Sequence, residues 1–239
     1  MDPKSMEPHG MAMLAFFDGD TNAEVSVRRD DGLEDSIPVS RFFRDASEFT
    51  PIEKAALEHC RGHVLDVGAG SGLHSLVLQE KGVPVTSIDI SPHAVEIMKQ
   101  RGVKDAHCAD IFEFEGGPYN TILLLGRGIG MVETMVGLDR FLAYAQGLVS
   151  VDGLVLLDSL DVRVTDNPTH LACHEANREA GRYIGENRLQ FHFQGKSGPN
   201  CCWLFVDPDT LKERAEAASW RCDVILREES GDYLAKLTK

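Results

Sequence analysis

The chain has 239 residues, and its composition of 43% hydrophobic and 26% charged residues fits one folded domain and excludes a disordered chain. The formal net charge of −14 opposes phosphate backbones, so no nucleic-acid partner is expected. No apolar run reaches the roughly 20 residues that cross a bilayer, and the first residues lack the order of a signal peptide, so we expect no membrane association and a cytoplasmic location.

The first 49 residues predict an N-terminal arm. Residues 11–17 are apolar enough to form a short amphipathic helix, and the Gly- and Asp-containing stretch 17–40 predicts an irregular extension. A helix is expected after the arm because Thr50 can serve as N-cap, with Pro51 at the first helical position and Glu53 as the capping-box partner. This helix would begin a main domain over residues 50–239.

From residue 63 onward, apolar strands alternate with helical segments. Strands are predicted at 63–69, 83–90, 104–110, 119–126 and 153–160, and helices at 71–82, 91–102 and 135–149. Such alternation is typical of a doubly wound α/β fold with a mostly parallel sheet. Residues 162–206 break the alternation and predict an insertion over the carboxyl edge of the sheet, with strand-like runs at 189–195 and 202–206. A last helix capped by Asp207 or Asp209 leads to a final pair of strands.

The sequence VLDVGAGSG at 64–72 runs from an apolar strand through closely spaced glycines into a helix. Small residues let the backbone approach a ligand, and the helix N-terminus supplies free N–H groups. The spacing differs from the dinucleotide fingerprint GxGxxG, because the residue three positions after Gly70 is Leu73. Asp66, two residues before the first glycine, would meet a positively charged group such as an amino-acid ammonium.

Two further carboxylates stand where strands end. Asp89 closes the second strand of the alternation and can accept both hydroxyls of a ribose, while Asp110 follows the third and can accept from an adenine amine. Each Asp alone could equally be a helix cap. Three of them in register with a glycine turn favour a nucleotide-like cofactor.

These motifs resemble the class I S-adenosylmethionine-dependent methyltransferases, over about residues 50–160 and again in the terminal strands. The likeness rests on VLDVGAGSG, SIDIS, CADIFEF and TILLLG. It implies a Rossmann-like, seven-stranded sheet whose last strand is antiparallel, with S-adenosylmethionine as cofactor and S-adenosylhomocysteine as product. It also implies that Asp66 and the turn 68–72 hold the methionine portion, Asp89 the ribose, and Asp110 with Ile111 the adenine.

A finer likeness is to bacterial methyltransferases whose fourth strand exits as LLLxNGIG. Here the exit reads LLLGRGIG, with Arg127 at the Asn position, and segment 38–45 is also similar, which suggests that Phe43 or Arg44 closes over the cofactor. His74 could reach the cofactor carboxylate or be a packed histidine. The expected cofactor-binding set is Arg44, Asp66, Gly68, Ala69, Gly70, Ser71, Gly72, His74, Asp89, Ile90, Asp110, Ile111 and Gly126.

The methyl acceptor is not identified by the sequence, and no catalytic residue is assigned. The strand exit lacks the Asn/Asp-Pro-Pro-Tyr-like signature of amine methylation, so carboxyl, hydroxyl, thiol and carbon acceptors remain. Arg127 could pair an acidic substrate, and a base could come from His170, His174 or Tyr183. No metal is expected, because a third ligand beside His170 and His174 is absent and the six cysteines form no CxxC pair.

The expected function is methyl transfer to a small molecule by a monomer or homodimer. Two alternatives remain: a non-catalytic protein that binds S-adenosylmethionine, and an NAD-dependent oxidoreductase on a similar fold. Cys201 and Cys202 could attack electrophiles, although packing is the expected use.

Overall fold

A seven-stranded sheet forms the centre of the protein in the computed structural model, which describes residues 1–239. Its strand order is β11-β12-β7-β6-β3-β4-β5. The strands are β3 (Val64–Val67), β4 (Val85–Asp89), β5 (Ala106–Cys108), β6 (Tyr119–Leu124), β7 (Val149–Leu160), β11 (Arg221–Arg227) and β12 (Asp232–Thr238). Strands β3 to β7 pair in parallel, and β12 is antiparallel to both β7 and β11. The expected doubly wound sheet with an antiparallel last strand is confirmed.

Helices cover both faces of this sheet, because alternate strand residues point to opposite sides. Leu65 and Ile122 pack in a core with α5 (Met135–Leu148) and α7 (Pro208–Ala217). Their neighbours Val64 and Leu123 pack in another core with α2 (Pro51–His59) and α3 (Leu73–Glu80). Helix α4 (Pro92–Arg101) covers the β5 end. No helix is both long and apolar enough to span a membrane.

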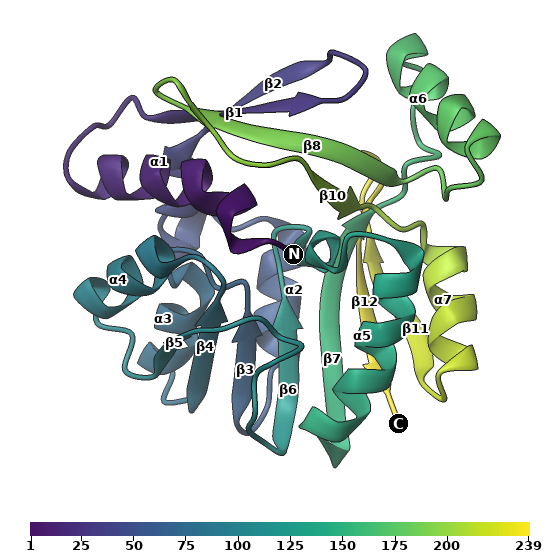
Figure 1. Cartoon of the computed structure of the whole chain (residues 1–239). Coiled ribbons are helices and arrows are strands. Elements are labelled where there is room, and N and C mark those ends of the chain that lie inside the picture. Colours follow the sequence, from purple (N-terminus) through teal and green to yellow (C-terminus); the bar gives the residue numbers. More distant parts are fainter.

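A second sheet joins the arm to the insertion. Its order is β10-β8-β1-β2, all antiparallel, with β9 paired to β8. The strands are β1 (Glu24–Arg29), β2 (Glu34–Pro38), β8 (Glu186–Phe193), β9 (Lys196–Ser197) and β10 (Cys201–Leu204). Figure 1 shows this sheet lying across one end of the central sheet, above α1 (Glu7–Phe17) and with α6 (Pro168–Glu179) beyond its far end. The arm and the insertion thus form one layer.

The prediction of an irregular extension at 17–40 was wrong, because residues 24–38 form the hairpin β1–β2. Val25 and Val27 alternate with polar residues, and Gly32 turns the chain with a φ of +90°, so the local pattern is that of a two-stranded hairpin. Helix α1 also begins at Glu7, earlier than expected. The strand expected at 202–206 lies at Cys201–Leu204 instead.

The arm is seated on the central sheet through α1, which crosses α4. At the crossing, a side chain on Gly10 would collide with Ser91 Oγ, so the two helices approach closely. Ala12 and Met13 of α1 share a core with Phe191 of β8 and Ile97 of α4. Residues 1–49 therefore lie against the carboxyl end of the central sheet. Their separation from residues 50–239 as a distinct unit stays a prediction.

Candidate functional site

The turn between β3 and α3 carries three glycines in the left-handed region. Gly68, Gly70 and Gly72 have φ values of +70°, +57° and +78°. At Gly72 a Cβ would stand 2.6 Å from Val103 Cγ2, so the glycine allows the turn to pack against the chain before β5. At Gly70 no atom lies within 4 Å of a Cβ position. One side of the turn is therefore open to a ligand that approaches the backbone.

Asp89 ends β4 next to this opening. Its Oδ2 accepts the Gly70 N–H at 2.9 Å, and its Oδ1 accepts the Ser91 N–H at 2.8 Å. Burial raises the pKa of Asp89, against the effect of these two hydrogen bonds. Each carboxylate oxygen keeps a second acceptor position, and the residue is partly exposed. Asp89 can thus hold the turn and accept two ligand hydroxyls at once.

Asp66 lies deeper than Asp89 and is only 2% exposed. Its Oδ2 accepts the Ser75 hydroxyl at 2.5 Å, which ties β3 to α3. Burial raises the pKa of Asp66, while the charge of His74 and the Ser75 hydrogen bond lower it. The structure gives Asp66 a partner within the protein, and its contact with a cofactor ammonium stays a prediction.

Asp110 lies at the rim of a hollow of about 360 Å³, together with Phe112, Val132 and Arg140. Its Oδ1 accepts the Phe112 N–H at 2.8 Å, and its Oδ2 lies 3.6 Å from the Met1 ammonium. Ile111 is buried in the main core. The hollow beside β5 is bounded by the carboxylates of Asp110, Glu113 and Glu133, by the Arg140 guanidinium and by apolar side chains such as Phe112 and Val132. Its carboxylates could accept hydrogen bonds from the amine of a flat heterocycle that packs on the apolar side chains.

Glu53, which the sequence suggested only as a capping residue, binds two of the side chains that were expected to contact the cofactor, Arg44 and His74. Its Oε1 lies 2.9 Å from both Arg44 Nη2 and His74 Nε2, and its Oε2 accepts the Thr50 N–H at 2.8 Å. Burial favours the neutral acid, but the hydrogen bonds from His74 and Thr50 and the charge of Arg44 outweigh it and hold the pKa of Glu53 at about 2. Arg44 and His74 are therefore fixed beside the glycine turn by a buried carboxylate.

Ser71 connects the turn to the arm. Its hydroxyl donates to the carbonyl of Phe42, and its own carbonyl accepts Arg101 Nη1 at 2.8 Å. Phe43 turns the other way and stacks on Phe16 of α1 at 4.8 Å between ring centroids. Of the two residues expected to close over the cofactor, Arg44 lies near α3 and Phe43 packs against α1.

The exit of β6 forms the other side of the opening. Gly126 is exposed with a φ of +72° and no atom within 4 Å of a Cβ position. Arg127 donates its N–H to Asp158 at 2.8 Å and its guanidinium to both oxygens of Asp232, at 2.8 and 3.0 Å. The Arg127 guanidinium, which we expected to pair with an acidic substrate, is therefore neutralised by Asp232.

Comparisons with known proteins agree with this geometry. A family model described as Methyltransferase domain matches residues 40–223, more than half of the chain. The crystal structure of a SAM-dependent methyltransferase from Bacteroides fragilis in complex with S-adenosyl-L-homocysteine is 33% identical, with 98% of this chain and 95% of that chain covered and a TM-score of 0.85. The chain belongs to the family of S-adenosylmethionine-dependent methyltransferases.

Two more distant likenesses are weaker. The ubiquinone biosynthesis O-methyltransferase of Caulobacter sp. (strain K31) is 28% identical over 131 residues, which cover 52% of this chain and 48% of that protein. The match thus spans about half the length of this curated relative. An amino pentose methyltransferase from Micromonospora echinaspora is 15% identical, with 78% of this chain and 86% of that chain covered and a TM-score of 0.51, and it supports the fold alone.

The three candidate bases of the methyltransferase have other partners or positions. Tyr183 donates its hydroxyl to Asp207 Oδ2 at 2.6 Å and accepts the Asp207 N–H, so it fixes the start of α7. His170 and His174 lie on α6, away from β3 and α3 (Figure 1). No group of three metal-ligating side chains occurs in the chain. Burial raises the pKa of Cys201 to about 12, so this thiol is not an activated nucleophile.

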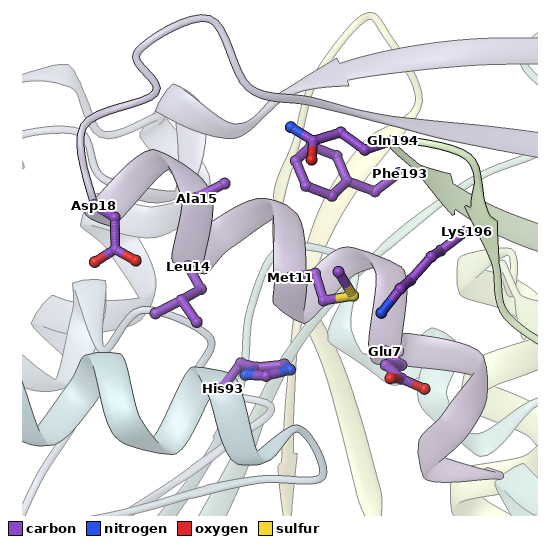
Figure 2. A pocket seen from close by; sticks show the side chains of 9 residues that line it. All are labelled: Glu7, Met11, Leu14, Ala15, Asp18, His93, Phe193, Gln194 and Lys196. Carbon is purple, nitrogen blue, oxygen red and sulfur yellow. The ribbon is translucent and has the colours of Figure 1, made fainter.

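A second hollow, of about 410 Å³, lies on the outer side of α1. Figure 2 shows it between α1, the β8–β9 turn and α4, with Met11, Phe193 and Lys196 among its lining residues. None of the expected cofactor-binding residues lines it. This hollow is separate from the opening at the strand ends, and the cofactor site of the methyltransferase is expected at the latter.

Proposed function

We propose that this protein transfers the methyl group of S-adenosylmethionine to a small-molecule acceptor. The observation that carries the proposal is the open side of Gly70 next to the Asp89 carboxylate, with Asp110 at the end of the neighbouring strand. Ligands of open α/β sheets bind outside the carboxyl ends of the strands. Gly70, Asp89 and Asp110 therefore follow one another along this edge, in an order that suits the methionine, ribose and adenine parts of the cofactor.

The residues that would hold the cofactor follow from their places at this edge. Asp89 with Ile90 would hold the ribose, Asp110 with Ile111 the adenine, and Asp66 with the turn 68–72 and Gly126 the methionine portion. Arg44 and His74, held by Glu53, would stand near the methionine carboxylate. The cofactor supplies a methyl group on a positively charged sulfur, and the protein aligns an acceptor lone pair with that carbon.

A small acceptor is favoured by the layer that covers the strand ends. The second sheet and α1 lie across this edge, so an acceptor must fit between them and the turn. The net charge of −14 opposes nucleic acids. The name of the Caulobacter relative, an O-methyltransferase of ubiquinone biosynthesis, is in keeping with a small organic acceptor. On composition, we place the protein in the cytoplasm as a monomer or homodimer.

Calorimetry with S-adenosylmethionine and S-adenosylhomocysteine tests the cofactor site. We expect micromolar binding by the unmodified protein and its loss in Asp89→Ala and Gly70→Val, because the first removes the ribose acceptor and the second fills the open side of the turn. Asp139→Ala, on the exposed face of α5, serves as the matched control. Absence of binding by the folded protein would refute the proposal.

Two further measurements separate the alternatives. Binding of NADH, seen by its fluorescence, would favour an oxidoreductase. Formation of S-adenosylhomocysteine in the presence of a metabolite extract would establish an enzyme, whereas cofactor binding without turnover of any extract would favour a non-catalytic binder.

A further inference from the structure

One buried carboxylate at the strand ends lies outside the expected cofactor-binding set. Asp158 is near the carboxyl end of β7 and is 7% exposed. Its Oδ1 accepts the Arg127 N–H at 2.8 Å, and no group of the protein donates a hydrogen bond to its Oδ2. The sealed, unpartnered polar side-chain atoms of the protein are Ser5 Oγ, His192 Nε2 and Glu228 Oε1, so Oδ2 of Asp158 is not sealed. This oxygen can therefore accept a hydrogen bond from a ligand.

The strand register places Asp158 on the same face of the central sheet as Asp66. Leu123 of β6 lies level with Asp66 of β3 and with Leu156 of β7. Asp158 and Gly68 each lie two residues beyond this level, and residues two apart in a strand point to the same side. Leu123 and Leu156 pack in the core with α2 and α3. Asp158 thus stands at the carboxyl edge on the side that α2 and α3 cover, with β6 between it and the glycine turn (Figure 1).

The start of α3 is close to both carboxylates. Burial raises the pKa of Asp66 and of Asp158, that of Asp158 to about 7, and the nearby charge of His74 acts on both in the opposite direction. His74 lies in the first turn of α3, where Glu53 holds its Nε2 at 2.9 Å. Asp66 and Asp158 therefore flank the place where the methionine portion of the cofactor is expected.

The cations on this side of the turn are already paired with other carboxylates. From the exit of β6, the Arg127 guanidinium binds both oxygens of Asp232 on β12. From the arm and from α3, Arg44 and His74 bind Glu53 on α2. No side chain of these elements is left to neutralise the two buried carboxylates. A ligand that brings a positive charge would do so.

Arg101 is the one cation at the turn without a carboxylate partner, and it lies on the other side. Its guanidinium binds the carbonyl and the hydroxyl of Ser71 and covers the Phe43 ring at 5.2 Å. It belongs to α4, which covers the β5 end of the sheet, whereas Asp158 belongs to β7, across β3 and β6 from β4 and β5. Arg101 therefore does not supply the missing charge.

We propose that Asp158 binds the α-ammonium group of the cofactor's methionine portion, as a second carboxylate that approaches from β7 while Asp66 approaches from β3. This inference rests on the proposed function. An ammonium group donates three hydrogen bonds. Oδ2 of Asp158 has no donor, and Oδ1 of Asp66 has none either, because the Ser75 hydroxyl binds its Oδ2. Each carboxylate thus keeps one oxygen for the ammonium group.

The ammonium group needs the ionised form of Asp158. With a pKa of about 7 in the empty protein, about half of the molecules carry a proton on Asp158 at pH 7. A bound ammonium group favours the carboxylate, so this proton passes to water as the cofactor binds. Affinity for the amino-acid head should therefore rise by about tenfold from pH 6 to pH 8, in step with the ionised fraction of Asp158.

Calorimetry with S-adenosylhomocysteine and methylthioadenosine tests this assignment, because methylthioadenosine keeps the nucleoside and the sulfur and lacks the amino-acid head. Asp158→Asn keeps an oxygen for the Arg127 N–H and loses the charge. At pH 8 it should bind S-adenosylhomocysteine at least about tenfold more weakly than the unmodified protein and methylthioadenosine equally well. Asp161→Asn is the matched control, since Asp161 is a buried carboxylate just beyond β7 that already pairs with Arg163. It should bind both compounds as the unmodified protein does.

The same titrations at pH 6, 7 and 8 provide a second measurement. The ratio of the two affinities should rise by about tenfold in the unmodified protein and clearly less in Asp158→Asn. Glu53, His74, Asp66 and Asp232, which face Asp158 from the neighbouring elements, titrate in both proteins. The difference between the two pH profiles therefore reports Asp158 alone.

The outcomes separate this inference from the proposed function. Failure of S-adenosylhomocysteine to bind the unmodified protein removes the proposed function. If it binds, equal weakening of both compounds in Asp158→Asn would show that Asp158 acts only through the Arg127 segment, and the inference is overturned. Unchanged binding in Asp158→Asn, or an affinity ratio that does not vary with pH in the unmodified protein, also overturns it. Weaker binding of S-adenosylmethionine alone would place Asp158 at the sulfonium and refute the ammonium contact.

Discussion

Asp158 gives a test of how burial and pH act on this fold. It lies near the carboxyl end of β7, is 7% exposed, and accepts the Arg127 N–H at 2.8 Å. Burial raises its pKa to about 7, although the hydrogen bond and charge of Arg127 act in the opposite direction. Asp158→Asn keeps the shape and the acceptor oxygen of the side chain and removes its titration. The substitution therefore isolates the energetic effect of the charge.

The sign follows from the proton that the folded state retains. Between about pH 4 and 7 the folded protein keeps Asp158 protonated while the unfolded chain, with a pKa of about 3.8, has lost that proton. Folding stability from this group therefore falls as the pH rises through this window. The displacement of about three pKa units corresponds to about 4 kcal/mol in total, of which about 3 kcal/mol falls between pH 5 and 8.

Urea unfolding at pH 5, 6, 7 and 8 measures this effect. From pH 5 to pH 8, the free energy of unfolding of Asp158→Asn should increase by about 3 kcal/mol relative to that of the unmodified protein. Asp232→Asn is the control. Burial acts to raise the pKa of Asp232, but the hydrogen bonds and charge of Arg127 outweigh burial and lower it. Asp232 is therefore ionised in both the folded and the unfolded protein above pH 5, and the stability that Asp232→Asn loses should be the same at each pH in this range. A pH-independent difference between Asp158→Asn and the unmodified protein would refute the reasoning.

Two further predictions concern the rim of the site. Thr50→Ala should lower the free energy of unfolding in urea by about 1 kcal/mol, because Thr50 Oγ1 accepts the Glu53 N–H and caps α2. Thr50→Ser should retain this cap. Equal stability of the two variants would contradict the prediction. Cys108, exposed at the end of β5 and bonded to the Ile90 carbonyl, should be alkylated by iodoacetamide several-fold more slowly with S-adenosylhomocysteine bound, measured by mass spectrometry at pH 8.5 because burial raises its pKa. An unchanged rate would place the cofactor elsewhere.

Local signals were enough for the central sheet and the glycine turn. Thr50, Pro51 and Glu53 form the capping box that their spacing predicts, and Asp207 caps α7 as one of the two expected candidates. These features depend on residues a few positions apart, whose hydrogen bonds the sequence itself specifies. The hairpin at 24–38 carries the same kind of local signal, in alternating Val and polar residues around Gly32, but the acidic, Gly- and Asp-containing composition of the same stretch predicted an irregular extension.

Pairings between distant residues could not be read from the sequence. Arg127 and Asp232, 105 positions apart, meet because β6 and β12 both flank β7, and this removes the cation expected for an acidic substrate. Glu53 binds Arg44 and His74 only because α2, the arm and α3 converge. The open sides of Gly70 and Gly126 are likewise properties of the assembled edge.

The sequence by itself determined a doubly wound sheet, a glycine turn at Gly68–Gly72 and carboxylates at three strand ends, because strand and helix periodicity and turn chemistry are local. Only the tertiary structure decided that the arm and the insertion form one sheet over those strand ends. The physical reason is that β1 and β8 pair because the packed core brings these two segments together. Neither segment has a local sequence pattern that predicts which strand it will pair with.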